Sequence, residues 1–402
     1  MVVSVCVDVT PVRSRLTGIG HYTLEVVKAL LDVSRSDPSR GTNNEEVRID
    51  VFDGFRVRPI EMFVSFSQER ESGYAQYWGD RLEKHVGIHA RAVFERYGGA
   101  LARRYHGRVG RGGYDVFHAM NFFAPAPLGR VTIPEIYDMS VLRHPTLHPA
   151  ERVRWFNSRL ASIASAPRVL TISQFSAHEI TDLVGVPAER IRVAYPGVDT
   201  RFFERARVDD EAALSRFGLT KGRYALSVST LEPRKNLRTL VDAYGRLPAE
   251  RRAAMPLVLV GGSGWGEMNW PAATEALVRD GQIRFTGYVD DGVLRTLYRG
   301  AAGFFYPSIY EGYGMPVTEA LACGAQVVVA SGGAPEEAAL GQGLLVDPLD
   351  TPAWTRAFEQ VIDEAASETE ARRDARRAAA ATRNWQETAR ITRDVYLEAA
   401  AF

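Results

Sequence analysis

The chain has 402 residues, more than one hydrophobic core usually holds, so its length indicates two or three domains. Apolar residues make up 46% of it and charged residues 24%, as in ordinary soluble globular proteins. The 49 basic residues balance the 49 acidic ones, which argues against a nucleic-acid partner.

An apolar run at residues 2–9 begins the chain, and we interpret it as a buried strand because no basic region precedes it and Asp8 interrupts it. We therefore expect no signal peptide, and no stretch has the ~18 apolar residues of a membrane-spanning helix. Cys6 and Cys323 lie in apolar runs and are predicted to be buried, reduced thiols, with a long-range disulfide as the less favoured alternative. These features predict a cytoplasmic protein, for which peripheral contact with the inner face of the cell membrane stays open.

Short apolar, β-branched runs alternate with helical patterns along nearly the whole chain. This alternation predicts an α/β protein with two doubly wound, Rossmann-like domains, each with about six parallel strands covered on both faces. The strand candidates are residues 2–9, 47–55, 114–119, 130–138, 168–173 and 191–199 in the first half, and 224–230, 256–262, 283–289, 303–308, 326–331 and 343–347 in the second. The clearest helical patterns cover residues 20–33, 236–247, 291–301 and 316–324.

A polar, charged segment near residues 204–223 separates the two halves. We therefore predict an N-terminal domain at residues 1–205 and a C-terminal domain at residues 206–385, with one long Ala-rich helix over residues 371–401. Ligands of such folds bind outside the carboxyl ends of the strands. Two domains of this kind that face one another would hold a ligand in the cleft between them.

Residues 60–113 form a less regular insert, and its part 89–112 has six arginines against one glutamate. A solvated amphipathic helix and loop would explain this composition. A basic face for an anionic lipid, or for a lipid-phosphate acceptor, would explain it equally well. The sequence does not decide between the two.

The first motif, "TGIGHY", follows the first strand and begins a helix. Gly18 and Gly20 allow close backbone approach at a helix N-terminus, where free N–H groups favour a phosphate. A third glycine is missing, so a dinucleotide site is poorly supported, and a tight strand-to-helix turn would also explain the pattern.

The second motif, "STLEPRKNL", follows the first strand of the second half. Pro233 stiffens the turn, and Asn236 is a candidate N-cap of the next helix. Arg234 and Lys235 are thereby predicted to lie at the mouth of the cleft, where two adjacent cations suit a diphosphate. Two solvated surface cations are the alternative.

The third motif, "EGYGMPVTE", joins a strand to a helix that Pro316 begins and Gly324 ends. Glu311 is predicted to lie on the loop and Glu319 in the first turn of the helix. These different positions argue against an acid/base pair acting on one bond. Carboxylates accept strongly from hydroxyl groups, so the pair suits a sugar and a ribose better, although Glu319 could simply interact with the dipole of its own helix.

The sequence contains no D-x-D and no His/Cys cluster with metal-ligand spacing. We therefore expect no metal, and we expect Arg234, Lys235 and helix N-termini to meet the charge of a leaving diphosphate. No serine nucleophile elbow and no P-loop lysine pattern occur, which disfavours hydrolases and NTPases.

Taken together, "TGIG", "TISQFSAHEI", "YPGVD", "LEPRKNL" and Glu311-x7-Glu319 resemble the retaining glycosyltransferases of family 4, from about residue 3 to the C-terminus. The resemblance implies the GT-B fold, with two Rossmann-like domains and a last helix, about residues 386–402, that crosses back to the first domain. It also implies transfer of a sugar from a nucleotide diphosphate sugar, without a metal, onto a glycan or a lipid-linked saccharide.

The resemblance implies a role for each residue of the site. Glu311 would contact hydroxyl groups of the donor sugar and Glu319 the ribose, while Arg234 and Lys235 would hold the diphosphate and Gly18 and Gly20 would close on it from the other domain. The backbone amides of Gly314, Met315 and Val317 would lie along the sugar and the phosphates.

Two positions depart from the pattern of the family. The family has a His-Asp pair at a strand end, and here Tyr137 replaces the histidine while Asp138 is retained on the acceptor side. Many members have Gly-Arg ahead of "EPRKN", where this chain has Ser229 and Thr230, so the phosphate charge would depend more on Arg234 and Lys235.

The motif wording resembles bacterial mannosyltransferases of polysaccharide assembly, which implies GDP-mannose as the donor. A uridine-diphosphate hexose is the alternative donor. A GT-B sugar-nucleotide epimerase and a non-catalytic sugar-nucleotide sensor are alternatives from other classes. An epimer formed from the donor alone would indicate the epimerase, and binding without transfer would indicate the sensor.

Overall fold

The computed structural model describes residues 2–12, 18–36, 46–53, 56–71, 107, 109, 112–122, 129–205, 209–262, 264, 268 and 270–402. It divides into two compact units. Unit 1 contains Met1–Met139, Glu151–Gly197 and Trp385–Phe402, and unit 2 contains Ser140–Ala150 and Val198–Asn384. The sequence-based boundary falls between residues 205 and 206, whereas the units divide between Gly197 and Val198. The segment Ser140–Ala150 also groups with unit 2, which the sequence did not predict.

Unit 1 is built on a seven-stranded sheet in the order β3-β2-β1-β4-β5-β6-β7. Its neighbouring strands are parallel except for β2 and β3, which are antiparallel. The sequence did not predict β3, because this strand has only three residues and ends in Pro59, which is tolerated only at a sheet edge. The strands are β1 (Val2–Asp8), β2 (Glu46–Phe52), β3 (Val57–Pro59), β4 (Val116–Ala119), β5 (Val131–Ile136), β6 (Val169–Thr171) and β7 (Ile191–Val193).

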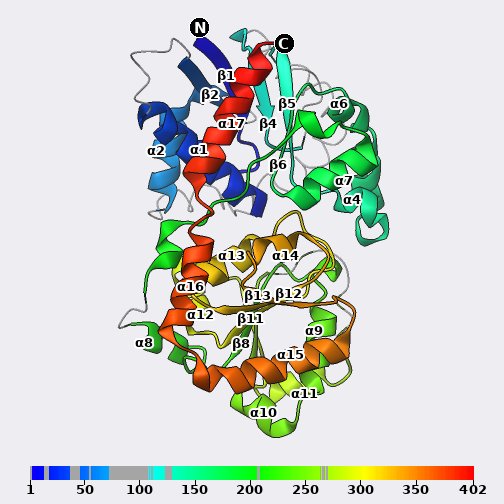
Figure 1. Ribbon diagram of the computed structural model, residues 1–402, viewed down its shortest axis with the longest axis vertical. Coiled ribbons are helices and arrows are strands. Elements are labelled where there is room, and N and C mark those ends of the chain that lie inside the picture. Colours follow the sequence, from blue (N-terminus) through cyan, green and yellow to red (C-terminus); the bar gives the residue numbers. More distant parts are fainter. Residues whose placement is uncertain are drawn as a thin grey trace, which may run out of the picture. The chain divides into compact units, whose positions relative to one another are not determined.

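The last helix of the chain, α17 (Trp385–Ala400), belongs to unit 1, where it packs on β1 and on α1 (Gly18–Ser36). Figure 1 shows α17 alongside these two elements. A buried polar chain ties it to the sheet, since the Tyr396 hydroxyl lies 2.7 Å from His118 Nδ1, and His118 Nε2 lies 3.0 Å from Glu135 Oε2. The remaining helices that lie in unit 1 or start at its junction are α2 (Ile60–Glu71), α5 (Ala150–Asn157), α6 (Leu160–Ala164), α7 (Gln174–Val184) and the short η4 (Ala188–Arg190).

Unit 2 is built on a six-stranded, fully parallel sheet in the order β10-β9-β8-β11-β12-β13. The chain winds outward from β8 to one edge and from β11 to the other, so the strand order reverses between these two central strands. Ligands of open parallel sheets bind at such a switch point, outside the carboxyl ends of the strands. The strands are β8 (Ala225–Val228), β9 (Leu257–Val260), β10 (Ile283–Gly287), β11 (Gly303–Tyr306), β12 (Gln326–Ala330) and β13 (Gly343–Val346).

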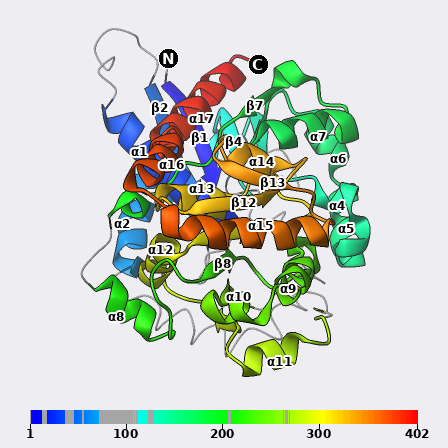
Figure 2. The same cartoon turned by 60° about the horizontal axis from the view of Figure 1, so that its bottom comes forward.

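Helices cover the sheet of unit 2, and Figure 2 shows α15 (Thr351–Glu364) lying in front of its strands. The other α-helices are α4 (Ser140–Arg143), α8 (Asp210–Ser215), α9 (Leu237–Gly245), α10 (Ala249–Ala254), α11 (Thr274–Arg279), α12 (Asp291–Gly300), α13 (Met315–Ala322), α14 (Ala334–Ala338) and α16 (Glu370–Ala380). The 3-10 turns are η3 (Pro145–Leu147), η5 (Thr200–Phe203), η6 (Pro233–Lys235) and η7 (Ala365–Ser367).

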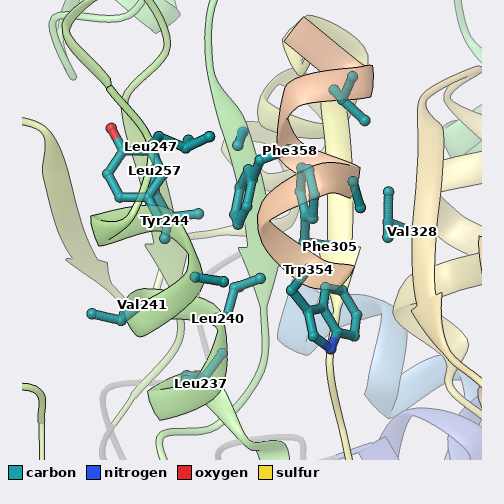
Figure 3. Packing of buried hydrophobic residues seen from close by; sticks show 14 of the residues in the cluster. Leu237, Leu240, Val241, Tyr244, Leu247, Leu257, Phe305, Val328, Trp354 and Phe358 are labelled. Carbon is teal, nitrogen blue, oxygen red and sulfur yellow. The ribbon is translucent and has the colours of Figure 1, made fainter. Parts of the chain in front are cut away.

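One core of unit 2 lies where α9 and α15 pack against each other and against the sheet (Figure 3). Phe305 of β11 stacks on Phe358 of α15, with 4.0 Å between the ring centroids. Trp354 has no exposed surface, and its indole Nε1 donates to the Asp347 carbonyl over 3.0 Å. This packing supports the central strands β8 and β11, whose carboxyl ends lie at the edge of the sheet where ligands of such folds bind.

The C-terminal region is two helices and not the single long helix that the Ala-rich sequence predicts. α16 ends at Ala380 and α17 begins at Trp385. The carbonyl of Arg383 accepts from the Val198 amide over 3.1 Å, and the Trp385 ring packs edge-on against Tyr22 with centroids 5.6 Å apart. These tertiary contacts hold the chain in a non-helical course at the junction, where helix propensity alone would continue the helix.

Three further sequence predictions concern the thiols, the membrane and the insert. Cys6 and Cys323 are free and buried, which confirms the thiol prediction. Within the described ranges, no helix has both the length and the apolar character to cross a membrane. The segment 89–112 lies outside the described residues except at positions 107, 109 and 112, so lipid contact through it stays a prediction.

Candidate active site

The turn after β8 is held by close backbone contacts with the loop that follows β9. The Leu231 amide donates to the Gly262 carbonyl over 2.9 Å, and the Gly264 amide donates to the Leu231 carbonyl over 3.0 Å. A Cβ atom at Gly261 would lie only 1.9 Å from the Ser229 carbonyl oxygen, so this approach requires glycine. The turn then enters η6, in which Pro233 supplies the first position and Arg234 and Lys235 follow.

Asn236 occupies the N-cap position of α9, as predicted, but it does not cap the helix with its side chain. Its backbone is left-handed, with φ 55°, a conformation that asparagine tolerates better than most residues. The side-chain amide instead donates to the carbonyls of Pro307 and Pro348, over 3.0 and 2.6 Å. Asn236 therefore ties the turn after β8 to the segment after β11.

Glu311 lies on the loop after β11, and both predicted cations form ion pairs with its carboxylate. Lys235 Nζ lies 2.5 Å from Oε1, and Arg234 Nη1 lies 2.8 Å from Oε2. The Tyr306 hydroxyl also donates to Oε1 over 3.0 Å, and Arg234 Nη1 donates to the Tyr310 carbonyl over 2.7 Å. Arg234 and Lys235 are thus largely buried and paired, and the alternative of two solvated surface cations is wrong.

A second carboxylate, Glu232, completes the cluster, and no role was predicted for it from the sequence. Arg234 Nη2 donates to Glu232 Oε1 over 2.8 Å, so the guanidinium lies between two carboxylates. Glu232 is 1% exposed, and its other oxygen is buried without a hydrogen-bond partner among the described residues. Its position directly before Pro233, in the motif that delivers both cations, is the sequence signal that could have identified it.

The cluster contains two cations and two carboxylates, so its formal charges cancel. Burial alone would raise the pKa of Glu311, but Arg234 and then Lys235 lower it to about 2. Burial and the neighbouring Arg234 lower the pKa of Lys235, against the raising effect of Glu311. Burial raises the pKa of Glu232 above its ordinary value, against the opposing effect of Arg234.

Glu319 lies apart from this cluster, on α13. Since α13 begins at Met315, Glu319 is beyond the first turn, and the prediction that placed it there is wrong. The helix starts one residue before Pro316, because Gly314 takes the N-cap position with φ 110°. Glu319 therefore gains little from its own helix dipole, and its carboxylate accepts from the Tyr298 hydroxyl of α12 over 3.0 Å.

The three backbone amides predicted for the site, at the start of α13, differ in whether the helix already provides them with a hydrogen-bond partner. Gly314 and Met315 lie at the N-terminus, where amide groups have no partner within the helix. The Val317 amide, in contrast, donates to the Gly314 carbonyl over 2.8 Å, so it is already engaged. Gly324, with φ 78°, follows the end of this helix as predicted.

Gly18, Gly20 and Asp138 belong to unit 1, whereas the residues above belong to unit 2. Gly18 and Gly20 are the first and third residues of α1, and Asp138 follows β5. Tyr137, in the position of the family histidine, is buried and donates its hydroxyl to the Met120 carbonyl over 2.8 Å. It packs edge-on against Tyr22 and is therefore a core residue of unit 1.

The structure resembles solved structures over nearly the whole of its chain. Anabaena HepE, in complex with UDP and glucose, has a TM-score of 0.66 and 16% identity, and the match covers 98% of this chain and 100% of HepE. Sucrose-phosphate synthase from Thermosynechococcus elongatus has a TM-score of 0.66 and 18% identity, with 98% of each chain covered. Two α/β units, each built on a largely parallel sheet, and these matches over nearly the whole chain show that the protein has the GT-B fold.

Sequence comparison identifies the family. The model of the group 1 glycosyl transferases matches residues 211–382, and the model of Glycosyltransferase Family 4 matches residues 62–202. O-antigen chain mannosyltransferase B from Escherichia coli is 33% identical over 356 residues, which cover 88% of this chain and 89% of that protein. The chain belongs to glycosyltransferase family 4 and is a hexosyltransferase, which favours sugar transfer over the epimerase and sensor alternatives.

Two further relatives match a smaller part of this chain. D-inositol 3-phosphate glycosyltransferase from Acidothermus cellulolyticus is 30% identical over 63% of this chain and 60% of its own length. The serotype-specific mannosyltransferase WbdA from Escherichia coli is 28% identical, but this chain spans only 29% of its length.

Proposed function

We propose that the chain is a retaining mannosyltransferase that transfers mannose from GDP-mannose to a glycan or a lipid-linked saccharide. The observation that carries the choice of sugar is its 33% identity to O-antigen chain mannosyltransferase B over nearly the whole length of both proteins. The site supports the choice of chemistry, because it holds two buried cations side by side at the switch point of a parallel sheet.

The donor would lie along the carboxyl edge of unit 2. Arg234 would bind the diphosphate through parallel N–H donors of its planar guanidinium, and Lys235 would bind it as a compact positive charge. Glu311 would accept from hydroxyl groups of the sugar and Glu319 from those of the ribose. The amides that begin α13, at Gly314 and Met315, would point at the phosphates or the sugar.

From unit 1, the proposed contributions are those of the start of α1 and of the end of β5. Gly18 and Gly20 would let the backbone approach the diphosphate closely. Asp138 would face the acceptor.

The balanced charge of the cluster has a mechanistic consequence. While Glu311 pairs with Arg234 and Lys235, their charges are satisfied without a ligand. When the donor binds, its diphosphate competes with the carboxylates for both cations, and Glu311 can turn part of its hydrogen-bonding capacity to the sugar. The cations are then in place before negative charge develops on the leaving phosphate, which is the condition for electrostatic stabilisation of a transition state.

In the proposed reaction, an acceptor hydroxyl forms a bond to the anomeric carbon as the bond from that carbon to the phosphate oxygen breaks. Attack from the face of the departing group retains the configuration. The hydroxyl proton passes to a phosphate oxygen, so the products are the glycoside and GDP. Arg234, Lys235 and the amides that begin α13 would stabilise the negative charge of GDP in place of a metal.

A panel of donors tests the nucleotide assignment. Thermal unfolding should be measured with GDP-mannose, GDP, UDP-glucose and UDP-N-acetylglucosamine, because a ligand that binds the folded chain raises the unfolding temperature by mass action. We expect GDP-mannose and GDP to stabilise the protein. Stabilisation by the uridine compounds alone would assign a UDP-hexose donor instead.

Lys235→Ala tests the role of the cluster. Turnover should fall by about 10²–10³-fold, as when one electrostatic contact to a developing anion is removed. Lys221→Ala, at an exposed lysine of the same unit, is the matched control and should leave turnover near that of the wild type. Near-normal transfer by Lys235→Ala, with unfolding still cooperative, would contradict the phosphate-binding assignment.

A further inference from the structure

The carboxylate of Glu319 depends on a single neutral donor. The Tyr298 hydroxyl, 3.0 Å from Oε2, is the hydrogen-bond donor that reaches this side chain in the described part of the chain. Glu319 is partly exposed, whereas Tyr298 has no exposed surface. Glu311, by contrast, is held by two cations in addition to Tyr306.

A row of aromatic rings fixes the position of Tyr298. Its ring meets Phe304 edge-on with centroids 5.4 Å apart, and Phe304 stacks on Tyr306 with centroids 5.9 Å apart. On its other side, Phe202 lies 6.0 Å from Tyr298. The hydroxyls of Tyr298 and Tyr306 each donate to one glutamate of the Glu311-x7-Glu319 pair, so one packed row aims both carboxylates.

The charges that face Glu319 are mostly negative. Burial raises the pKa of Glu319 to about 7, Asp291 of α12 and Asp199 before η5 add to the increase, and the Tyr298 hydroxyl opposes it. Cys323, the C-cap of the same helix, stays a neutral thiol, since burial raises its pKa to about 12. Arg295 is a cation on this side, and it lies over the Phe202 ring at 6.0 Å and lowers the pKa of Asp199.

We propose that Tyr298 is a positioning residue for the nucleotide, whose hydroxyl orients the Glu319 carboxylate toward the ribose. This inference rests on the proposed function, which places the ribose at Glu319. An ionised carboxylate accepts from ribose hydroxyls better than a protonated one does. Donor affinity therefore rises with pH as Glu319 ionises, and the Tyr298 hydroxyl lowers the pH at which this happens.

Tyr298→Phe is the direct test, because it keeps the ring in its row and removes only the hydroxyl. Loss of a hydrogen bond to a charged group shifts a carboxyl pKa by about one unit or more, here upward. Isothermal titration with GDP-mannose should show about fivefold weaker binding at about pH 7 and nearly equal binding at about pH 9. Both phosphates of GDP-mannose are esterified and stay ionised over this range, so they do not contribute to the profile.

Tyr244→Phe is the matched control, since Tyr244 is a buried tyrosine of the same unit whose hydroxyl lies within hydrogen-bond distance of three backbone carbonyls and of no carboxylate that the structure describes. It should lower stability without moving the pH midpoint of binding. The 2′,3′-dideoxy analogue of GDP-mannose should bind wild type and Tyr298→Phe with the same weak dependence on pH.

A second variant covers the case in which Tyr298→Phe does not fold. At about pH 7, binding of GDP-mannose by the wild type should release protons, measurable as a dependence of the titration heat on the buffer, and Glu319→Gln should abolish the release. Uniformly weaker binding by Tyr298→Phe at every pH, or proton release unchanged in Glu319→Gln, would overturn the inference alone. If the wild type binds no nucleotide sugar, the proposed function fails and the inference with it.

Discussion

Glu311→Gln removes the negative charge that lies between Arg234 and Lys235 while keeping the shape of the side chain. In the folded chain these cations lower the pKa of Glu311 from 4.5 to about 2, a shift that corresponds to about 3 kcal/mol in favour of the ionised form. Breaking a buried ion pair by removing one partner has a similar effect, about 3–5 kcal/mol. We therefore expect the free energy of unfolding to fall by about 3 kcal/mol at neutral pH.

The assay is urea unfolding of wild type and variant between neutral and acidic pH. Because the folded pKa is depressed, the stabilisation by Glu311 is fully present above about pH 4.5 and is lost as the pH falls toward about 2, so the two proteins should converge in acid. Glu387→Gln, at an exposed ion pair with Arg390 on α17, is the matched control and should change stability by less than about 1 kcal/mol. Pyrophosphate should stabilise Glu311→Gln more than the wild type, since it supplies the missing negative charge. A loss below about 1 kcal/mol at neutral pH would refute the reasoning, because the cluster would then not depend on this carboxylate.

Three further changes test other parts of the structure. Trp354→Ala should lower the free energy of unfolding by about 3–5 kcal/mol, because it leaves a cavity in the core. Leu349→Ala, at a 70% exposed position, is the control and should change it by less than about 0.5 kcal/mol. Equal urea midpoints for the two variants would contradict this expectation. Asn236→Asp replaces a donor with an acceptor opposite the Pro307 and Pro348 carbonyls. We therefore expect the free energy of unfolding to fall by about 1–3 kcal/mol, together with a fall in turnover. Unchanged kinetics would show that these hydrogen bonds do not position the cations. Glu319→Gln should stabilise the ligand-free protein by about 3 kcal/mol at about pH 8. The raised pKa of Glu319 means that its stabilising contribution is present below about pH 4.5 and lost as the pH rises through about 7, so a difference that persists in acid would exclude this cause.

The parallel strands of both units could be predicted from the sequence because strands buried on both faces are short, nearly continuous apolar runs between turns. The edge strand β3 could not, since three residues with a proline have no such pattern. The break between α16 and α17 was also missed. Alanine favours a continuous helix, and the contacts that interrupt it, from Val198 to Arg383 and from Tyr22 to Trp385, join residues far apart in the sequence.

For the site, the sequence identified the side chains better than their partners. Arg234, Lys235 and Glu311 were recognisable because each follows a strand, and they meet because β8 and β11 are neighbours. That neighbourhood is a property of strand order, which local patterns do not contain. Tyr298 was missed for the same reason, since it reaches Glu319 from the middle of a different helix and has no local pattern to mark it.

We propose that this chain transfers mannose from GDP-mannose with retained configuration, and one measurement tests this directly. Real-time NMR of GDP-mannose with the protein and octyl α-mannoside as acceptor follows the anomeric proton of the donor, of any new glycoside and of any mannose released to water. We expect loss of GDP-mannose, appearance of GDP and an α anomer as the first product. A β anomer formed first, or GDP-mannose left intact while UDP-glucose is consumed under the same conditions, would contradict it.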